Sequence, residues 1–222
     1  HLVAFHDDHL RRVTGRAGRV RDHTLADLQT MSVLGGAPIA ALADVLATYT
    51  DTCFTIDVKE SAAVEPLARL LSDLGAAPRV CVAASHGSWL RALVGATGPA
   101  LTTALPWRHV AQLASRGPFG HLDAAFAHLP LRLGRLPVFR DDLVARAHDA
   151  GIRVLVWTVD DPDTMHRLLD HGVDGIITDR PDVLREVLIS RAQWVAPDVR
   201  TAAVHPMITS ATPARPCGRP SV

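Results

Sequence analysis

Four side chains that could do chemistry stand at or near the ends of short apolar runs: His6, Asp57, Lys59 and Trp157. A lysine ammonium can neutralise an oxygen of an anionic substrate, and a carboxylate can hold a divalent metal ion. An imidazole can donate a proton to a leaving oxygen. Together these groups suit a reaction on an anion. Trp157 is expected to form a wall of the pocket, with a core aromatic as the alternative.

Asp57 and Lys59 lie two residues apart on an expected strand, so their side chains point to the same face. They could form part of a site or only an ion pair, and the sequence leaves both open. Lys59 is the only lysine in a chain whose other basic residues are arginines, which favours a role for a compact ammonium over a planar guanidinium. For His6, a polar turn after a strand is the simpler alternative.

The elements that must position these groups alternate between short apolar runs, which predict strands covered on both faces, and longer segments with helical spacing. Helix start and stop signals, such as Asp161-Pro162 and Gly172, support the later helices. The expected strands span residues 1–6, 53–58, 80–84, 101–105, 124–127, 154–159 and 175–178, and the expected helices span residues 24–31, 39–49, 62–74, 88–94, 109–116, 141–150, 162–171 and 180–188.

This alternation implies parallel pairing through right-handed crossovers, and hence an α/β fold. About six strand–helix units are present, two short of an eight-stranded barrel of the TIM type, whose active site lies at the C-terminal ends of the strands. A doubly wound open sheet is the alternative. Residues 1–190 are expected to form the folded unit, and residues 191–222, where Pro, Thr, Ser and Ala are common, a disordered tail.

The composition excludes some partners. Lys and Arg total 23 and so do Asp and Glu, so no strong field attracts nucleic acid or an anionic membrane. No uninterrupted apolar run is long enough to span a bilayer. The chain begins at His1, so we expect its true N-terminus to be absent, and both cytoplasmic and secreted locations stay open.

The chain resembles the glycerophosphodiester phosphodiesterase family from residue 1 to about residue 188. The segment that follows the first apolar run is similar to the family's His-Asp-x-x-Leu-x-Arg-x-Thr motif. Later segments match the family's Ile-Glu-Ile-Lys strand and its last two strands. In this chain the matching residues are His6-Asp7-x-x-Leu10-x-Arg12-x-Thr14, Ile56-Asp57-Val58-Lys59, Val156-Trp157-Thr158-Val159 and Gly172-Val173-Asp174-Gly175-Ile176-Ile177-Thr178-Asp179.

The resemblance implies a TIM barrel that uses a divalent metal ion, Ca²⁺ or Mg²⁺, to hydrolyse glycerophosphodiesters to glycerol 3-phosphate and an alcohol. His6 would then be the acid/base that protonates the leaving alcohol oxygen. Asp57 would stand at the family's third metal carboxylate, where glutamate is usual, and Lys59 would contact the phosphate. Trp157 would line the glycerol side of the pocket.

The chain departs from the family in having neither its His-Arg-Gly strand nor its Glu-x-Asp metal pair. The resemblance places these motifs upstream of His1, together with the first catalytic histidine and two of three metal carboxylates. We therefore expect a (β/α)8 barrel lacking its first two strands, with little or no hydrolase activity. Two exposed sheet edges would also make this fragment prone to aggregation.

Two other functions stay open on the sequence. One is a non-catalytic barrel remnant that binds phosphorylated ligands or a partner. The other is a phospholipase D-like lyase acting on lysophospholipids or sphingomyelin, which would release a cyclic phosphate.

Overall fold

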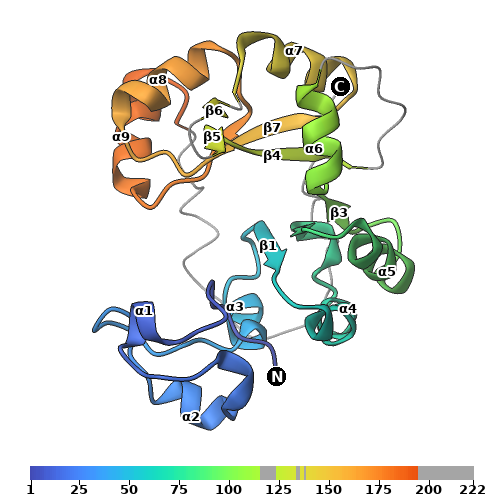
Figure 1. The fold of residues 1–222 in the computed structure, drawn as a ribbon, viewed down its shortest axis with the longest axis vertical. Helices are drawn as coiled ribbons and strands as arrows, with labels where there is room; N and C mark the ends of the chain where they lie inside the picture. The colour runs from blue at the N-terminus through green and yellow to red at the C-terminus, as the bar shows by residue number, and fades with distance from the viewer. Residues whose placement is uncertain (116–123, 134–135, 138, 195–222) are drawn as a thin grey trace, which may run out of the picture. The chain divides into compact units, whose positions relative to one another are not determined.

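The computed structural model describes residues 1–115, 124–133, 136–137 and 139–194, which fall into two compact units (Figure 1). The first unit spans residues 1–106, and the described part of the second spans residues 107–194. Both units combine helices with parallel strands, which confirms the predicted α/β class. Within the described ranges, no helix has the length and apolar character that a membrane span requires.

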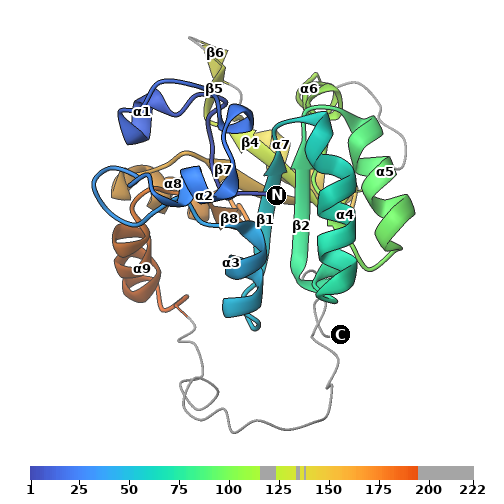
Figure 2. The same ribbon diagram turned by 90° about the horizontal axis from the view of Figure 1, so that it is seen from below.

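The first unit contains a parallel sheet with the strand order β1-β2-β3. The register of β1 on β2 runs from Phe54 opposite Val80 to Val58 opposite Ala84. Helices α4 and α5 lie side by side and provide the crossovers between the strands (Figure 2). The bounds are β1 (Phe54–Val58), α4 (Val64–Asp73), β2 (Val80–Ala84), α5 (Gly87–Thr97) and β3 (Thr102–Thr103).

The core of the first unit forms where the helical and strand periods bring apolar side chains to the same side. Leu67 and Leu71 lie four residues apart on α4, while Val80 and Val82 alternate along β2. These four side chains, with Leu93 of α5, belong to one cluster and are at most 2% exposed. The packing explains why the predicted strand at residues 80–84 and the helix stop at Gly75 agree with the structure.

The strand predicted for residues 1–6 does not form, and this expectation was wrong. Only one antiparallel bridge occurs there, between Val3 and Ala41, flanked by hydrogen bonds from Ala4 N–H to Ala40 and from Leu42 N–H to Leu2. The ladder cannot extend because the chain enters α3 (Leu42–Thr48) directly after this bridge.

Two short helices shape the polar stretch that follows the bridge. They are α1 (Arg11–Thr14) and α2 (Leu25–Gln29). A reciprocal capping box between Thr24 and Asp27 begins α2, as the predicted helix at residues 24–31 requires. The segment has its own apolar cluster of Leu10, Leu28, Met31 and Ile39.

The second unit contains a parallel sheet with the order β4-β7-β8. Figure 1 shows β4 and β7 side by side, and their register runs from Phe126 opposite Arg153 to Pro130 opposite Trp157. A short antiparallel pair, β5 with β6, follows β4. The bounds are α6 (Trp107–Ala114), β4 (Phe126–Pro130), β5 (Arg132–Leu133), β6 (Leu136–Pro137), α7 (Asp141–Asp149), β7 (Arg153–Trp157), α8 (Pro162–Asp170), β8 (Gly175–Ile176) and α9 (Pro181–Ser190).

Two carboxylates secure the two-residue strand β8 against β7. Before β8, Asp174 Oδ2 accepts the Val154 N–H at 2.7 Å and lies 2.8 Å from His148 Nε2. After it, Asp160 Oδ1 accepts both the Thr178 hydroxyl and the Asp179 N–H at 2.8 Å. A strand this short has few ladder bonds of its own, so side-chain acceptors at both ends hold its register.

Residues 191–194 fold back after α9. Arg191 Nη1 forms an ion pair with Asp170 Oδ1 at 2.8 Å, and the Trp194 N–H donates to the Leu188 carbonyl at 3.1 Å. The rest of the predicted tail, residues 195–222, lies outside the described residues.

Arg79 is a charged side chain in the interior of the first unit, only 8% exposed. Its Nη1 donates to the carbonyls of Tyr49 and Thr52 at 2.9 and 3.1 Å, and its Nη2 donates to Leu46 at 2.6 Å. The guanidinium therefore satisfies carbonyls in and after the last turn of α3, which the helix cannot pair by itself. It also lies 5.5 Å from the centre of the Phe54 ring.

Replacing Arg79 with methionine is expected to lower the free energy of unfolding by about 3 kcal/mol, because three carbonyls lose a charged donor. Chemical denaturation measures the loss. Arg69→Met is the matched control, because Arg69 forms an ion pair with Glu65 at 3.3 Å and both side chains are exposed. Equal stability of the two variants would contradict the assigned role of Arg79.

Replacing Asp174 with alanine is expected to speed hydrogen exchange of the Val154 amide about tenfold, as the loss of one hydrogen bond implies. Exchange followed by NMR measures this directly. Asp163→Ala on α8 is the control and should leave the Val154 amide unchanged. Unaltered protection in Asp174→Ala would show that β8 is held without this carboxylate.

Candidate functional site

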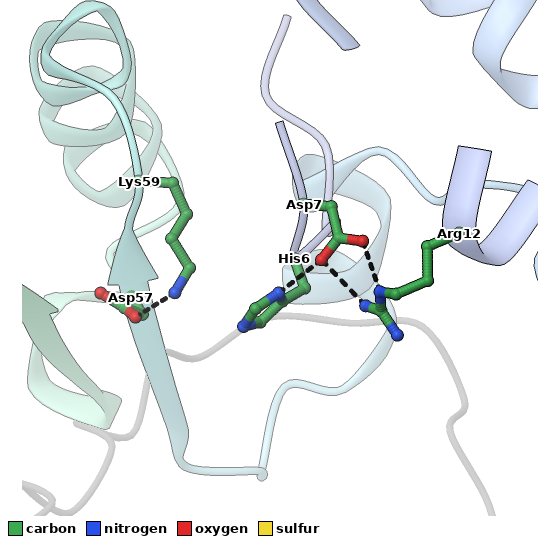
Figure 3. A network of polar contacts seen from close by, with 5 residues as sticks. All are labelled: His6, Asp7, Arg12, Asp57 and Lys59. Carbon is green, nitrogen blue, oxygen red and sulfur yellow. Dashed lines mark hydrogen bonds and ion pairs between the residues drawn. The ribbon is translucent and has the colours of Figure 1, made fainter. Parts of the chain in front are cut away.

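His6, Asp7 and Arg12 form a connected polar network (Figure 3). His6 Nδ1 lies 2.7 Å from Asp7 Oδ1. Arg12 donates twice to the same carboxylate, from Nε to Oδ2 at 2.5 Å and from Nη2 to Oδ1 at 2.9 Å. The His6 side chain is 76% exposed and that of Asp7 only 21%. The imidazole therefore faces solvent while its partner is largely covered.

The network depends on the short helix α1, which turns the chain back after His6. Leu10, directly before α1, is fully buried, and its N–H donates to the Gly18 carbonyl at 3.1 Å. The helix ends at Gly15, whose φ of 71° lies in the left-handed region that glycine adopts without strain. This anchored turn carries Arg12 back to Asp7, five residues earlier.

The Arg12 guanidinium holds the pKa of Asp7 well below its ordinary value of 3.8, and the hydrogen bond from His6 acts in the same direction. Both partners stabilise the charged form of the carboxyl group. Asp7 is therefore a carboxylate throughout the physiological pH range.

Asp57 and Lys59 lie at the C-terminal end of β1, where Asp57 pairs with Ala83 of β2. The Lys59 Nζ is 2.5 Å from Asp57 Oδ2, and the two side chains are 48% and 43% exposed. The predicted common face is confirmed, and the ion pair that the sequence left open is present. In the view of Figure 3, the His6 ring lies between this pair and the Asp7–Arg12 pair.

A metal ion needs more ligands than this arrangement supplies. No group of three or more His, Cys, Asp or Glu side chains suited to a metal occurs among the residues that the structure describes. One oxygen of Asp57 already contacts Lys59, and both oxygens of Asp7 accept from Arg12. Divalent ions such as Ca²⁺ and Mg²⁺ require several oxygen ligands. The described residues therefore do not by themselves form such a site.

Trp157 is the last residue of β7, in the second unit, and is 36% exposed. Its ring meets that of Trp107, the first residue of α6, edge to face at 6.4 Å between centroids. Trp157 is therefore not fully buried in a core, and its place in a pocket wall stays a prediction.

The structure thus joins Asp57 to Lys59 directly and pairs His6 with Asp7, whose carboxylate also accepts from Arg12. The sequence reasoning assigned no role to Arg12 or Trp107. Arg12 stands between residues 6 and 24, where the sequence predicts neither a strand nor a helix, so its return toward Asp7 could not be inferred from spacing. Trp107 follows the predicted strand at residues 101–105, and this position near a strand end is the sequence feature that could have marked it as a candidate.

Residues 1–183 match the model of the glycerophosphoryl diester phosphodiesterase family. The chain belongs to this family. The protein named Probable glycerophosphodiester phosphodiesterase 2 of Mycobacterium tuberculosis is 37% identical over 200 residues, which cover 86% of this chain and 76% of the relative. A glycerophosphodiester phosphodiesterase of Caldanaerobacter subterraneus is 27% identical, covering 83% and 79%. These matches confirm the resemblance predicted from the sequence.

Solved structures of this family share the fold. A glycerophosphodiester phosphodiesterase from Parabacteroides distasonis is similar with a TM-score of 0.66 at 19% identity, covering 86% of this chain and 79% of its own. An Oleispira antarctica phosphodiesterase, solved with the product sn-glycerol-3-phosphate, gives a TM-score of 0.66 at 20% identity, covering 84% and 79%. At this level of identity the similarity concerns the fold.

The lowered pKa of Asp7 predicts how its contribution to stability depends on pH. A carboxyl group whose pKa is lower in the folded chain stabilises the fold above its unfolded value, 3.8, and loses this effect as pH falls. The difference in melting temperature between wild type and Asp7→Asn is expected to be constant above about pH 5 and to shrink below it. Added salt should reduce the difference because the pair faces solvent. A difference that grew on acidification would contradict this assignment.

Proposed function

We propose that this protein acts in the hydrolysis of glycerophosphodiesters to glycerol 3-phosphate and an alcohol. The observation that carries the proposal is the family match over residues 1–183, a range that contains all four candidate residues. The relatives from M. tuberculosis and C. subterraneus bear the name of this activity. The product in the Oleispira structure supports the same substrate class.

In this proposal His6 supplies the proton that the leaving alcohol oxygen takes up as its bond to phosphorus breaks. One water molecule is consumed, because its oxygen joins phosphorus and one of its protons ends on the alcohol. Lys59 neutralises a phosphate oxygen, for which it must exchange part of its contact with Asp57. Trp157 lines the glycerol side of the pocket.

Family membership also suggests a divalent metal ion, with Asp57 as one carboxylate ligand. The described residues fall short of a complete site, so no step is assigned to the metal. We propose that the other ligands, the first catalytic histidine and two barrel strands come from outside the 222 residues. The His-Arg-Gly and Glu-x-Asp motifs that would carry these groups do not occur in this sequence. Residues 1–190 would then form an incomplete barrel, and residues 191–222 a tail.

The 222-residue chain alone is therefore expected to release little or no glycerol 3-phosphate from glycerophosphocholine, with either Ca²⁺ or Mg²⁺ present. Phosphorus NMR follows substrate and product together, and it would also reveal a cyclic phosphate from a lyase. The M. tuberculosis relative serves as the reference enzyme. The decisive comparison is with a chimera. In it, a segment of a family member that carries both missing motifs is joined before His1.

The chimera is expected to hydrolyse the substrate, and His6→Ala in it should reduce turnover by at least about a hundredfold, the contribution usual for a general acid. Arg21→Ala, an exposed change in the same segment, should leave turnover unchanged. Turnover by the unextended chain near that of the reference enzyme would refute the dependence on outside residues. A chimera that binds substrate without turnover would favour a binding function.

A further inference from the structure

The contact between His6 and Asp7 has a defined direction. An ionised carboxylate carries no proton and can only accept hydrogen bonds, whereas each ring nitrogen of a neutral histidine either donates or accepts. His6 Nδ1 lies 2.7 Å from Asp7 Oδ1, so at this distance Nδ1 must carry the proton. The other ring nitrogen, Nε2, then holds the lone pair.

Arg12 holds the Asp7 carboxylate in place, and this carboxylate determines which ring nitrogen of His6 carries the proton. Its two donations reach both oxygens of Asp7, so the carboxylate plane is set by a paired guanidinium. Asp7 is mostly covered, whereas the His6 ring is exposed. An exposed ring would otherwise rotate freely about its side-chain bonds, and a fixed acceptor on one nitrogen removes most of that freedom.

We propose that Asp7 and Arg12 are positioning residues, which hold the neutral His6 as the Nδ1–H tautomer and leave Nε2 as the nitrogen that first takes up a proton and then gives it to the leaving alcohol oxygen. Neither residue touches the substrate in this arrangement. The inference rests on the proposed role of His6 and adds which atom acts and what sets it. A neutral histidine side chain free in water favours the opposite tautomer, with the proton on Nε2, so the effect of the pair is measurable.

Nitrogen-15 NMR of the imidazole rings distinguishes the two tautomers in the 222-residue chain without substrate. The chain has 12 histidines, and the spectrum of His6→Gln identifies the signals of His6 by their loss. At about pH 8.5 an unperturbed imidazole is neutral, and there we expect His6 to be mainly Nδ1–H. In Asp7→Ala and Asp7→Asn the Nε2–H form should become the major one. Arg12→Gln should lower the Nδ1–H fraction while Asp7 remains.

Asp8→Asn is the matched control, because Asp8 is the neighbouring acid and contacts His9 and Arg19 at 3.4 and 3.5 Å. It should leave the His6 tautomer unchanged. An Nε2–H form of His6 in the wild-type chain, or an unchanged tautomer in both Asp7 variants, would overturn the inference. The measurement involves no turnover, so a chimera that failed to hydrolyse substrate would refute the proposed function and leave this result standing.

Discussion

Carboxylates, which can only accept hydrogen bonds, hold the chain together at two places where the structure describes little regular secondary structure. Asp7 accepts from His6 and Arg12 in a segment whose strand-type contacts are isolated bridges. Asp160 and Asp174 do the same around β8, a strand of two residues. In each case one carboxylate fixes several donors at once, which a short strand or a loop cannot do through its own backbone.

The same interaction serves two different purposes. Around β8 the donors include backbone N–H groups, so these carboxylates hold strands in register. At Asp7 the donors are side chains, and one of them, His6, has a second nitrogen directed away from the carboxylate. This second nitrogen of His6 is the one that the proposed function uses. The difference lies in the donors, because the acceptor is an aspartate in all three places.

The sequence predicted the elements whose periodicity is enforced by burial. The strand at residues 80–84 agrees in both bounds because Val80 and Val82 are packed on the core, and the common face of Asp57 and Lys59 follows from the strand period alone. The first six residues were mispredicted as a strand, because an apolar run does not reveal whether a partner continues beside it. The return of Arg12 to Asp7 depends on the buried anchor Leu10, which spacing does not encode.

The family motif at residues 172–179 holds structure in place, whereas the candidate acid/base, His6, lies in another segment. Asp174 in Gly172-Val173-Asp174-Gly175 accepts a backbone N–H of β7, and Thr178 and Asp179 donate to Asp160, so the contacts of this motif hold the two-residue strand β8 in place. Without the carboxylates of Asp174 and Asp160, the donors around β8 would lose these acceptors. Around His6, the corresponding carboxylate of Asp7 joins two side chains across a turn, and no strand pattern marks these contacts in the sequence. At His6, the contact with Asp7 determines which ring nitrogen carries the proton in the inferred tautomer. The other nitrogen is then the one through which His6 can act as an acid or base.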